Sequence, residues 1–180
     1  IPLPHPAIKN FIAYLNLGMA AFIVAGLNSR FTFTSIPMEN PGIIHLLASP
    51  FKRKKIYRFK LLFFAIPLFI IGFILFLTGG IALHLASFSR TSGFFFLVPV
   101  LPFLTVLSLF YGLKIEESVP LTPEHLIASK NGISYMFWSL IYIVVSMIYM
   151  VRPLYLYYKS KMFKQVIPTF EISLWFAGFL

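Results

Sequence analysis

The stretch that decides the fold is residues 51–89, FKRKKIYRFKLLFFAIPLFIIGFILFLTGGIALHLASFS. Its first ten residues hold six of the fifteen basic residues of the chain, and no Lys, Arg, Asp or Glu follows before Arg90. The uncharged run is long enough for one helix to cross a bilayer, which needs about 20 apolar residues. The basic block marks the side on which that helix begins, because Lys and Arg collect on the cytoplasmic side of a membrane.

The composition of the whole chain indicates the same class of protein. Hydrophobic residues make up 59% and charged residues 11%, whereas a soluble domain has about 25% charged residues. A soluble fold of 180 residues cannot bury this much apolar surface, so lipid must be part of its solvent. The net charge of +10 does not indicate nucleic acid as a partner, because the cations stand at the ends of apolar runs.

Four uncharged stretches are long enough to span a bilayer, and a fifth begins near the last residue. The predicted spans are residues 10–29, 61–89, 91–113 and 133–151, with the start of a further span at 167–180. No strand-like alternation persists, which argues against a barrel. We therefore expect an all-α membrane protein, with residues 1–180 forming a single polytopic transmembrane helix bundle. Because the sequence begins at Ile1 and stops in an apolar stretch, we expect it to be a piece of a longer polypeptide.

The loops between these spans predict an orientation. The 30–60 loop carries seven Lys or Arg and one Glu, so the positive-inside rule places it in the cytoplasm. Alternation then puts the 114–132 loop on the same side. It puts the basic segment 152–164 outside, against the rule. Either that segment is an exception, or one of the two middle spans does not cross fully, and the sequence leaves both possibilities open.

The loop before the basic block contains a predicted short helix. Asn40 and Pro41 are typical of a helix start, and Glu39 lies near the positive end of its dipole. Pro50 ends the helix, because the residue before a proline is disfavoured in the α region. The apolar residues between form one face, so the 39–49 helix either lies on the membrane surface or contacts a soluble domain. Elementary physical chemistry favours the membrane surface.

Two blocks of the chain resemble ABC-2-type transporter permeases. In their cytoplasmic loop a Glu, a Pro and a Lys punctuate a short coupling helix, and the corresponding residues here are Glu39, Pro50 and Lys60. The sequence RFTF at 30–33 is similar to the R-F-x-F entry of a subgroup of ABC exporter permeases. The second block is similar to the P-x-x-I-x-x-S-x-x-G-x-x-Y-M-x-x-S-L-x-Y pattern of that subgroup. Its matching residues are Pro123, Leu126, Ser129, Gly132, Tyr135, Met136, Ser139, Leu140 and Tyr142.

The two blocks cover roughly fifty residues, and the spans between them fit the family's layout. Two positions depart from the subgroup pattern, because Pro37 and Ile44 stand where it has a Ser and an aromatic residue.

This resemblance implies a permease subunit of an ABC-type exporter that moves substrate across the membrane. A separate ATPase domain binds and hydrolyses ATP, and its closure pushes on the amphipathic coupling helix at 39–49. ATP and Mg²⁺ then sit on that ABC ATPase subunit, while this chain has no cofactor and is not an enzyme. The chain contains no G-x-x-x-x-G-K-[ST] phosphate loop, which agrees with this interpretation. The resemblance further implies a dimer of permeases in the lipid bilayer, in the inner membrane of a prokaryotic cell with the 30–60 loop cytoplasmic.

The predicted site residues fall into two groups and one isolated position. The residues expected to contact the ATPase are Glu39, Ile43, Ile44, Leu46, Leu47 and Pro50. The cations expected to lie at the membrane surface and set the orientation are Lys52, Arg53, Lys54, Lys55, Arg58 and Lys60. His84 is an intramembrane polar candidate, although a position near the end of a long span is typical of the interface. No catalytic residue and no metal site is predicted, because the histidines lack partners at metal-ligand spacing.

Two other classes of function compete with the permease. A membrane-embedded enzyme acting on lipids would use the basic block to hold an anionic headgroup, and it would need an acidic or His cluster at one membrane surface. Glu116 and Glu117 are the only adjacent acids, and a solvated loop explains them better. A non-catalytic membrane scaffold would instead bind other proteins through small residues on its helices.

Overall fold

The computed structural model describes residues 6–38, 53–82, 87–115, 122–162 and 169–179. Within these ranges almost every residue is helical and none is in a strand. The helices are α1 (Pro6–Arg30), α2 (Thr32–Met38), α4 (Arg53–Ala82), α5 (Ser87–Leu113), α6 (Pro123–Ala128), α7 (Lys130–Met162) and α8 (Thr169–Phe179). The predicted all-helical architecture is thereby confirmed. The predicted coupling helix at 39–49 lies outside the described residues.

Four stretches of helix are long and apolar enough to cross a membrane. They are Phe11–Met38, Tyr57–Ala82, Thr91–Leu113 and Lys130–Arg152. The first is longer than the 10–29 stretch expected from hydropathy because it runs through α1 into α2. The backbone N–H of Phe31 donates to the carbonyl of Leu27 at 3.0 Å, so the helical hydrogen-bond pattern continues across the residue between α1 and α2.

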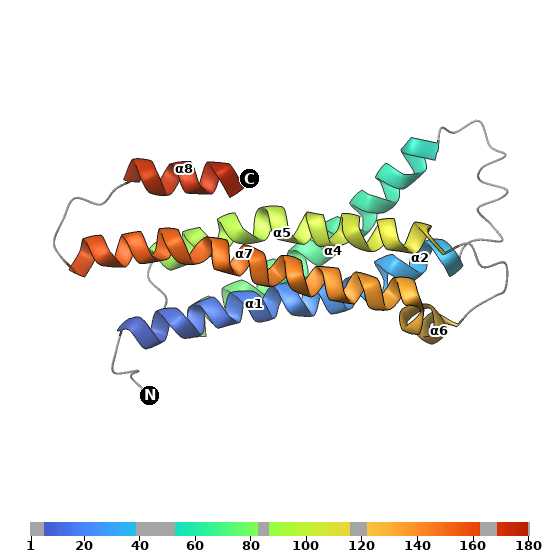
Figure 1. The fold of residues 1–180 in the computed structure, drawn as a ribbon, viewed down its shortest axis with the longest axis horizontal. Helices are drawn as coiled ribbons and strands as arrows, with labels where there is room; N and C mark the ends of the chain where they lie inside the picture. Colours follow the sequence, from blue (N-terminus) through green and yellow to red (C-terminus); the bar gives the residue numbers. More distant parts are fainter. Residues whose placement is uncertain (1–5, 39–52, 83–86, 116–121, 163–168, 180) are drawn as a thin grey trace.

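The four long helices lie side by side and alternate in direction (Figure 1). α1 and α5 end at the end of the bundle where α2 and α6 lie, and α4 and α7 begin there. At a rise of about 1.5 Å per residue, the 30 residues of α4 and the 27 residues of α5 are both long enough to cross. The 11-residue α8 turns back along α7 and α5 at the other end.

The core is built around α5, which packs on α1, α2, α4 and α7. Its fully buried apolar residues are Phe96, Leu97, Val100, Leu101 and Leu104, each at most 1% exposed. α4 is the least buried of the candidate spans, and large apolar side chains such as Phe63, Ile66 and Ile70 are more than half exposed on it. Apolar side chains pointing outward are what a lipid-facing helix requires, so the burial pattern agrees with a membrane bundle.

Candidate functional site: a buried polar junction at the basic end

Polar side chains gather where α1, α2, α5 and α7 meet, at the end of the bundle that also holds α6. Asn28, Thr32, Ser108 and Tyr135 are each 0% exposed, and together they are called the polar junction below. They come from positions far apart in the sequence, since 80 residues separate Asn28 from Ser108. Polar groups buried in a membrane bundle are uncommon and need partners inside the protein, so this cluster is the first candidate for a functional site.

The polar junction ties α5 and α7 to α1 through two side-chain to backbone hydrogen bonds, and a third bond joins the side chains of Thr32 in α2 and Asn28 in α1. The Ser108 hydroxyl donates to the carbonyl of Asn28 at 2.9 Å, and the Tyr135 hydroxyl donates to the carbonyl of Ala25 at 3.0 Å. The Thr32 hydroxyl donates to Oδ1 of Asn28 at 2.9 Å. Interhelical bonds of this kind contribute about 0.6 kcal/mol each in a membrane, and up to about 1.7 kcal/mol. They therefore fix the register of α5 and α7 against α1.

One donor of the junction lacks a partner. The Nδ2 atom of Asn28 is buried and makes no hydrogen bond within the described part of the chain. Leaving a buried donor unpaired costs about 1–3 kcal/mol, a cost that an apolar residue of similar size would avoid. A position that retains such a group is a candidate for function rather than for packing alone.

Helix α2 is held against the junction by a close backbone contact. Pro37 lies inside α2 and has no N–H, so the carbonyl of Phe33 loses its usual helical partner. Gly112 of α5 packs against that carbonyl so closely that a Cβ atom at Gly112 would lie 2.6 Å from the oxygen. The ring of Phe33 stacks on the ring of Tyr135, with centroids 6.2 Å apart. α2 is therefore in contact with both α5 and α7.

Cations surround this end of the bundle, which is called the basic end below. Lys60 donates from Nζ to the carbonyl of Ser35 at 3.3 Å and so joins α4 to α2. The Lys114 ammonium group lies 4.4 Å from the ring centroid of Phe110 and 5.3 Å from that of Tyr111. The exposed cations of the basic end are Arg30, Lys55, Arg58, Lys114 and Lys130.

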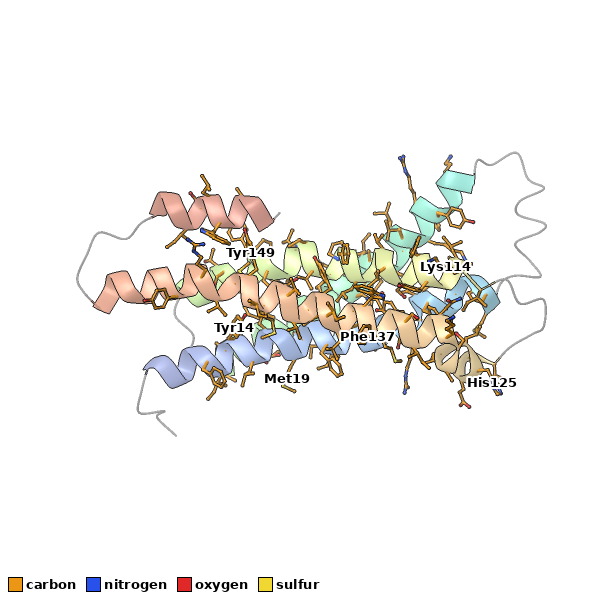
Figure 2. The ribbon with its side chains drawn as sticks, in the orientation of Figure 1. Tyr14, Met19, Lys114, His125, Phe137 and Tyr149 are labelled. Carbon is orange, nitrogen blue, oxygen red and sulfur yellow. The ribbon has the colours of Figure 1, made fainter. Side chains whose placement is uncertain are left out.

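The second sequence block forms the connection between α6 and α7 at the basic end. Pro123 is the first residue of α6, and Leu126 is 1% exposed beneath it. Ser129 ends α6, and its hydroxyl accepts from the backbone N–H of Gly132 at 3.2 Å. Figure 2 shows His125 of α6 and Lys114, the residue directly after α5, at this same end. The spacing of the block thus builds a tight turn that leads Tyr135 into the polar junction.

The opposite end holds a smaller aromatic cluster that fastens α8 to α7. The Tyr149 hydroxyl donates to the carbonyl of Trp175 at 3.2 Å, and the two rings lie 4.6 Å apart. The Arg152 guanidinium group lies 4.5 Å from the Trp175 ring centroid. A cation over an aromatic ring stabilises by about 0.5–2 kcal/mol, so this cluster is sufficient to hold a short helix in place.

The structure describes only part of the site that the sequence predicts. The residues that lie outside the described ranges are Glu39, Ile43, Ile44, Leu46, Leu47, Pro50, Lys52 and His84. Arg53 and Lys54 begin α4, Lys55 and Arg58 are exposed, and Lys60 is partly buried. Among the described residues no group of three or more His, Asp or Glu is arranged to hold a metal ion.

Comparison with known families gives one match, which runs along nearly the whole chain. A family described as "Putative ATP-binding cassette" matches residues 2–180. The chain belongs to this family. No curated protein and no solved structure matches it.

This family assignment corrects the identification made from the sequence. The resemblance to ABC-2-type permeases rested on two blocks of roughly fifty residues, and Pro, Ser and Gly at such spacings recur in membrane loops and turns. The family match covers residues 2–180, and the family's description names the ATP-binding part of such transporters, not the permease. The predicted ABC-2-type exporter permease is therefore wrong, and neither the lipid-modifying enzyme nor the scaffold gains support.

Two predictions that depended on the permease are corrected with it. The chain was expected to be a transport subunit without enzymatic activity, with ATP and Mg²⁺ confined to a partner. The family description instead suggests ATP binding, with Mg²⁺, and ATPase activity in this protein itself.

The described residues nevertheless do not fit an ATP and Mg²⁺ site. A phosphate loop needs a strand, a glycine-rich turn and a Lys before the following helix. The printed sequence has no G-x-x-x-x-G-K-[ST], and the described ranges contain helices without a strand. Their carboxylates form no cluster that could hold a cation. The described helices supply four candidate membrane spans and the polar junction.

Sequence reasoning missed most of the polar junction. Tyr135 was singled out by the second block, whereas Asn28, Thr32 and Ser108 were not. A signal was present, because Asn28 is a strongly polar residue inside the last turn of the predicted 10–29 span. Thr32 and Ser108 carry little information alone, because Ser and Thr hydroxyls commonly hydrogen-bond to a backbone carbonyl of their own helix.

Proposed function

We propose that this chain is a membrane-embedded helical component of an ATP-binding cassette transporter, and that ATP-driven movement reaches its helices at the basic end. The observation that carries the proposal is the family match over residues 2–180, on a chain with four candidate membrane spans. The polar junction supports it, because a buried cluster with one unpaired donor is a place where helices can exchange hydrogen-bond partners.

The proposal includes an orientation. The basic end would face the cytoplasm of a prokaryotic cell, in the inner membrane, because cations collect on that side and ATP is present there. Exposed Lys and Arg residues from α1, α4, α5 and α7 support this assignment. The basic segment 152–164, which includes the last turns of α7, would then lie on the outer side as an exception to the positive-inside rule.

The segment 39–49 is proposed as the point where movement enters the bundle. It would form a short amphipathic helix whose contact residues are Glu39, Ile43, Ile44, Leu46, Leu47 and Pro50. Two described contacts support this role: α2 precedes the segment and is packed on Gly112, and α4 follows it and is tied back to α2 through Lys60. A displacement between α2 and α4 would therefore reach α5 and α7 through the polar junction.

The partners proposed are the other chains of the same transporter, including a second copy of this one. The exposed apolar surface of α4 supports a second copy, because small and apolar helix surfaces associate within lipid. His84 comes two residues after the last residue of α4 in the sequence and is proposed as a polar group near the outer end of that span.

The proposal can be tested by following ATP-dependent changes at the basic end. The printed sequence has no cysteine, so a cysteine-free version of the full-length protein can carry a single Cys at Glu39. Its labelling rate with a membrane-impermeant maleimide is measured in proteoliposomes without nucleotide, with ATP, and with ATP and vanadate. We expect the rate to change with ATP and to lock with vanadate. A Cys at Tyr155, which is exposed beyond Arg152, is the control and is expected to change less.

Two outcomes contradict the proposal. The first is that the purified full-length protein, together with whatever copurifies, hydrolyses no ATP. The second is that the labelling rates at Glu39 and at Tyr155 are the same with and without nucleotide.

A further inference from the structure

An exposed apolar stripe runs along α5 and ends at a cation. Its residues are Phe103, Val106, Phe110 and Lys114, spaced by three or four positions so that they share one surface of the helix. The three apolar side chains are 43%, 46% and 52% exposed, and Lys114 is exposed as well. From Phe103 to Lys114 the helix rises about 16 Å. That is close to one leaflet of a hydrocarbon core about 30 Å thick.

Helix α7 borders the stripe at both of its ends. The ring of Phe103 stacks on the ring of Tyr142 with centroids 4.0 Å apart. At the other end, Nδ2 of Asn131 donates to the carbonyl of Lys114 at 3.2 Å. Eleven positions separate the two contacts on each helix, so α5 and α7 run antiparallel in constant register along the stripe. Trp138 of α7 lies four positions before Tyr142 and seven after Asn131, so it shares their side of the helix. It is 51% exposed.

The charge at the end of the stripe is positive. The Asn131 side chain donates to the backbone carbonyl of Lys114, and Lys130 directly precedes Asn131. The backbones of the two lysines are therefore close together. The ammonium group of Lys114 lies over two aromatic rings, and within the described ranges no carboxylate forms an ion pair with it. A ring surface attracts the cation but does not neutralise it. A negatively charged group at this level of the membrane is therefore attracted to both lysines.

From this combination we propose that the α5 stripe, together with Lys114 and Lys130, binds an anionic phospholipid of the leaflet at the basic end. One acyl chain lies along Phe103, Val106 and Phe110, and the phosphate meets Lys114. The length of the stripe matches the acyl chains of a single leaflet, and basic sites between helices on the cytoplasmic side recognise anionic headgroups. This site rests on the orientation proposed above, but it does not depend on transport activity.

The test uses the full-length protein in mixed detergent and lipid micelles. Native mass spectrometry compares retention of phosphatidylglycerol with retention of phosphatidylcholine of the same chain length. We expect the wild type to prefer phosphatidylglycerol, and Lys114→Gln to lower that preference about fivefold, the effect of one Lys near a membrane surface. Arg58→Gln is the matched control, because Arg58 is an exposed cation at the same end on α4. It is expected to leave the preference nearly unchanged.

Additional arms separate the possible sources of the negative charge. If a lipid is bound, inorganic phosphate at millimolar concentration does not displace it, and shortening its acyl chains to six carbons weakens binding. Neutralising Glu116 and Glu117, which follow Lys114 closely in the sequence, is expected to keep or raise the preference. Thermal unfolding of Lys114→Gln and Arg58→Gln, measured in the same micelles, is expected to match the wild type because both side chains are exposed.

Three results overturn the proposal. Equal loss of preference in Lys114→Gln and Arg58→Gln shows only diffuse attraction to a positive surface. Full displacement by inorganic phosphate shows an anion site without a lipid. Unchanged lipid retention in Lys114→Gln, combined with loss of a copurifying protein chain, assigns the lysine to an acidic protein partner.

Discussion

The contact between Gly112 and the carbonyl of Phe33 gives the sharpest prediction for Gly112→Ala. A Cβ atom there would lie 2.6 Å from the carbonyl oxygen of Phe33, and 3.4 Å and 3.6 Å from its carbonyl carbon and Cα. These are backbone atoms, so the clash is relieved only if α2 moves away from α5. Movement of α2 would in turn disturb the stacking of Phe33 on Tyr135.

The magnitude follows from two opposing terms. Overpacking a well-packed contact costs about 1–3 kcal/mol, and an immovable backbone neighbour places this case at the upper end. Replacing a helical Gly by Ala returns about 1 kcal/mol through helix propensity. We therefore expect Gly112→Ala to lower the free energy of unfolding by about 1–2 kcal/mol.

Gly26→Ala is the matched control for this variant. Gly26 also lies in a candidate span, and nothing lies within 4 Å of a Cβ atom placed there. It gains the propensity term without the clash, so the difference between the two variants isolates the steric cost, about 2–3 kcal/mol. The assay is unfolding in mixed micelles with increasing sodium dodecyl sulfate, followed by circular dichroism. Equal stability of the two variants would refute the close contact between α2 and α5.

Three further predictions concern the polar junction, the opposite end and the topology. Tyr135→Phe is expected to lower the free energy of unfolding by about 0.6–1.7 kcal/mol through loss of its bond to Ala25, and no effect in the same unfolding assay would place its hydroxyl elsewhere. Trp175→Ala removes the ring that contacts Arg152 and Tyr149 and is expected to loosen α8, although the backbone carbonyl at 175 can still accept from Tyr149. The loosening would be seen as faster limited proteolysis near residues 163–168, with Leu174→Ala, 60% exposed, as the control. Single cysteines at Lys130 and Tyr155 are expected to label from opposite sides of a sealed vesicle, and labelling from one side would contradict the crossing of α7.

Hydropathy was sufficient to find the four long helices. Lipid offers no hydrogen-bond partners, so the backbone N–H and C=O groups of a long apolar run must pair with one another, which a helix allows. It was less informative about where they end. The first candidate span runs on to Met38, past residue 29, where the predicted span ended and the predicted 30–60 loop began. Ser29 and Ser35 satisfy their hydroxyls on carbonyls of the preceding turn, so these polar residues did not interrupt the helix.

The identification from short motifs failed for a different reason. Residues 123–142 do form a defined unit, with α6 capped at Ser129 and Tyr135 led into the core. Such a turn between two helices is a solution that unrelated membrane proteins can share, so it carries information about local structure more than about family. The match along residues 2–180 draws on the whole chain and therefore decides the family.

The sequence by itself determined the class of the protein, the number of long apolar helices and the gathering of cations beside them, because these depend on the transfer of each segment from water to lipid. Only the tertiary structure decided which polar groups meet. Asn28 and Ser108 come together, as do Ala25 and Tyr135, because α5 and α7 are packed on α1. The α5 stripe likewise depends on packing, because the constant register of α5 and α7 sets which side chains remain exposed between Phe103 and Lys114. Contacts between residues 80 and 110 positions apart produce no repeating pattern in the sequence. The hydropathy of each helix is the same whichever helix it packs against.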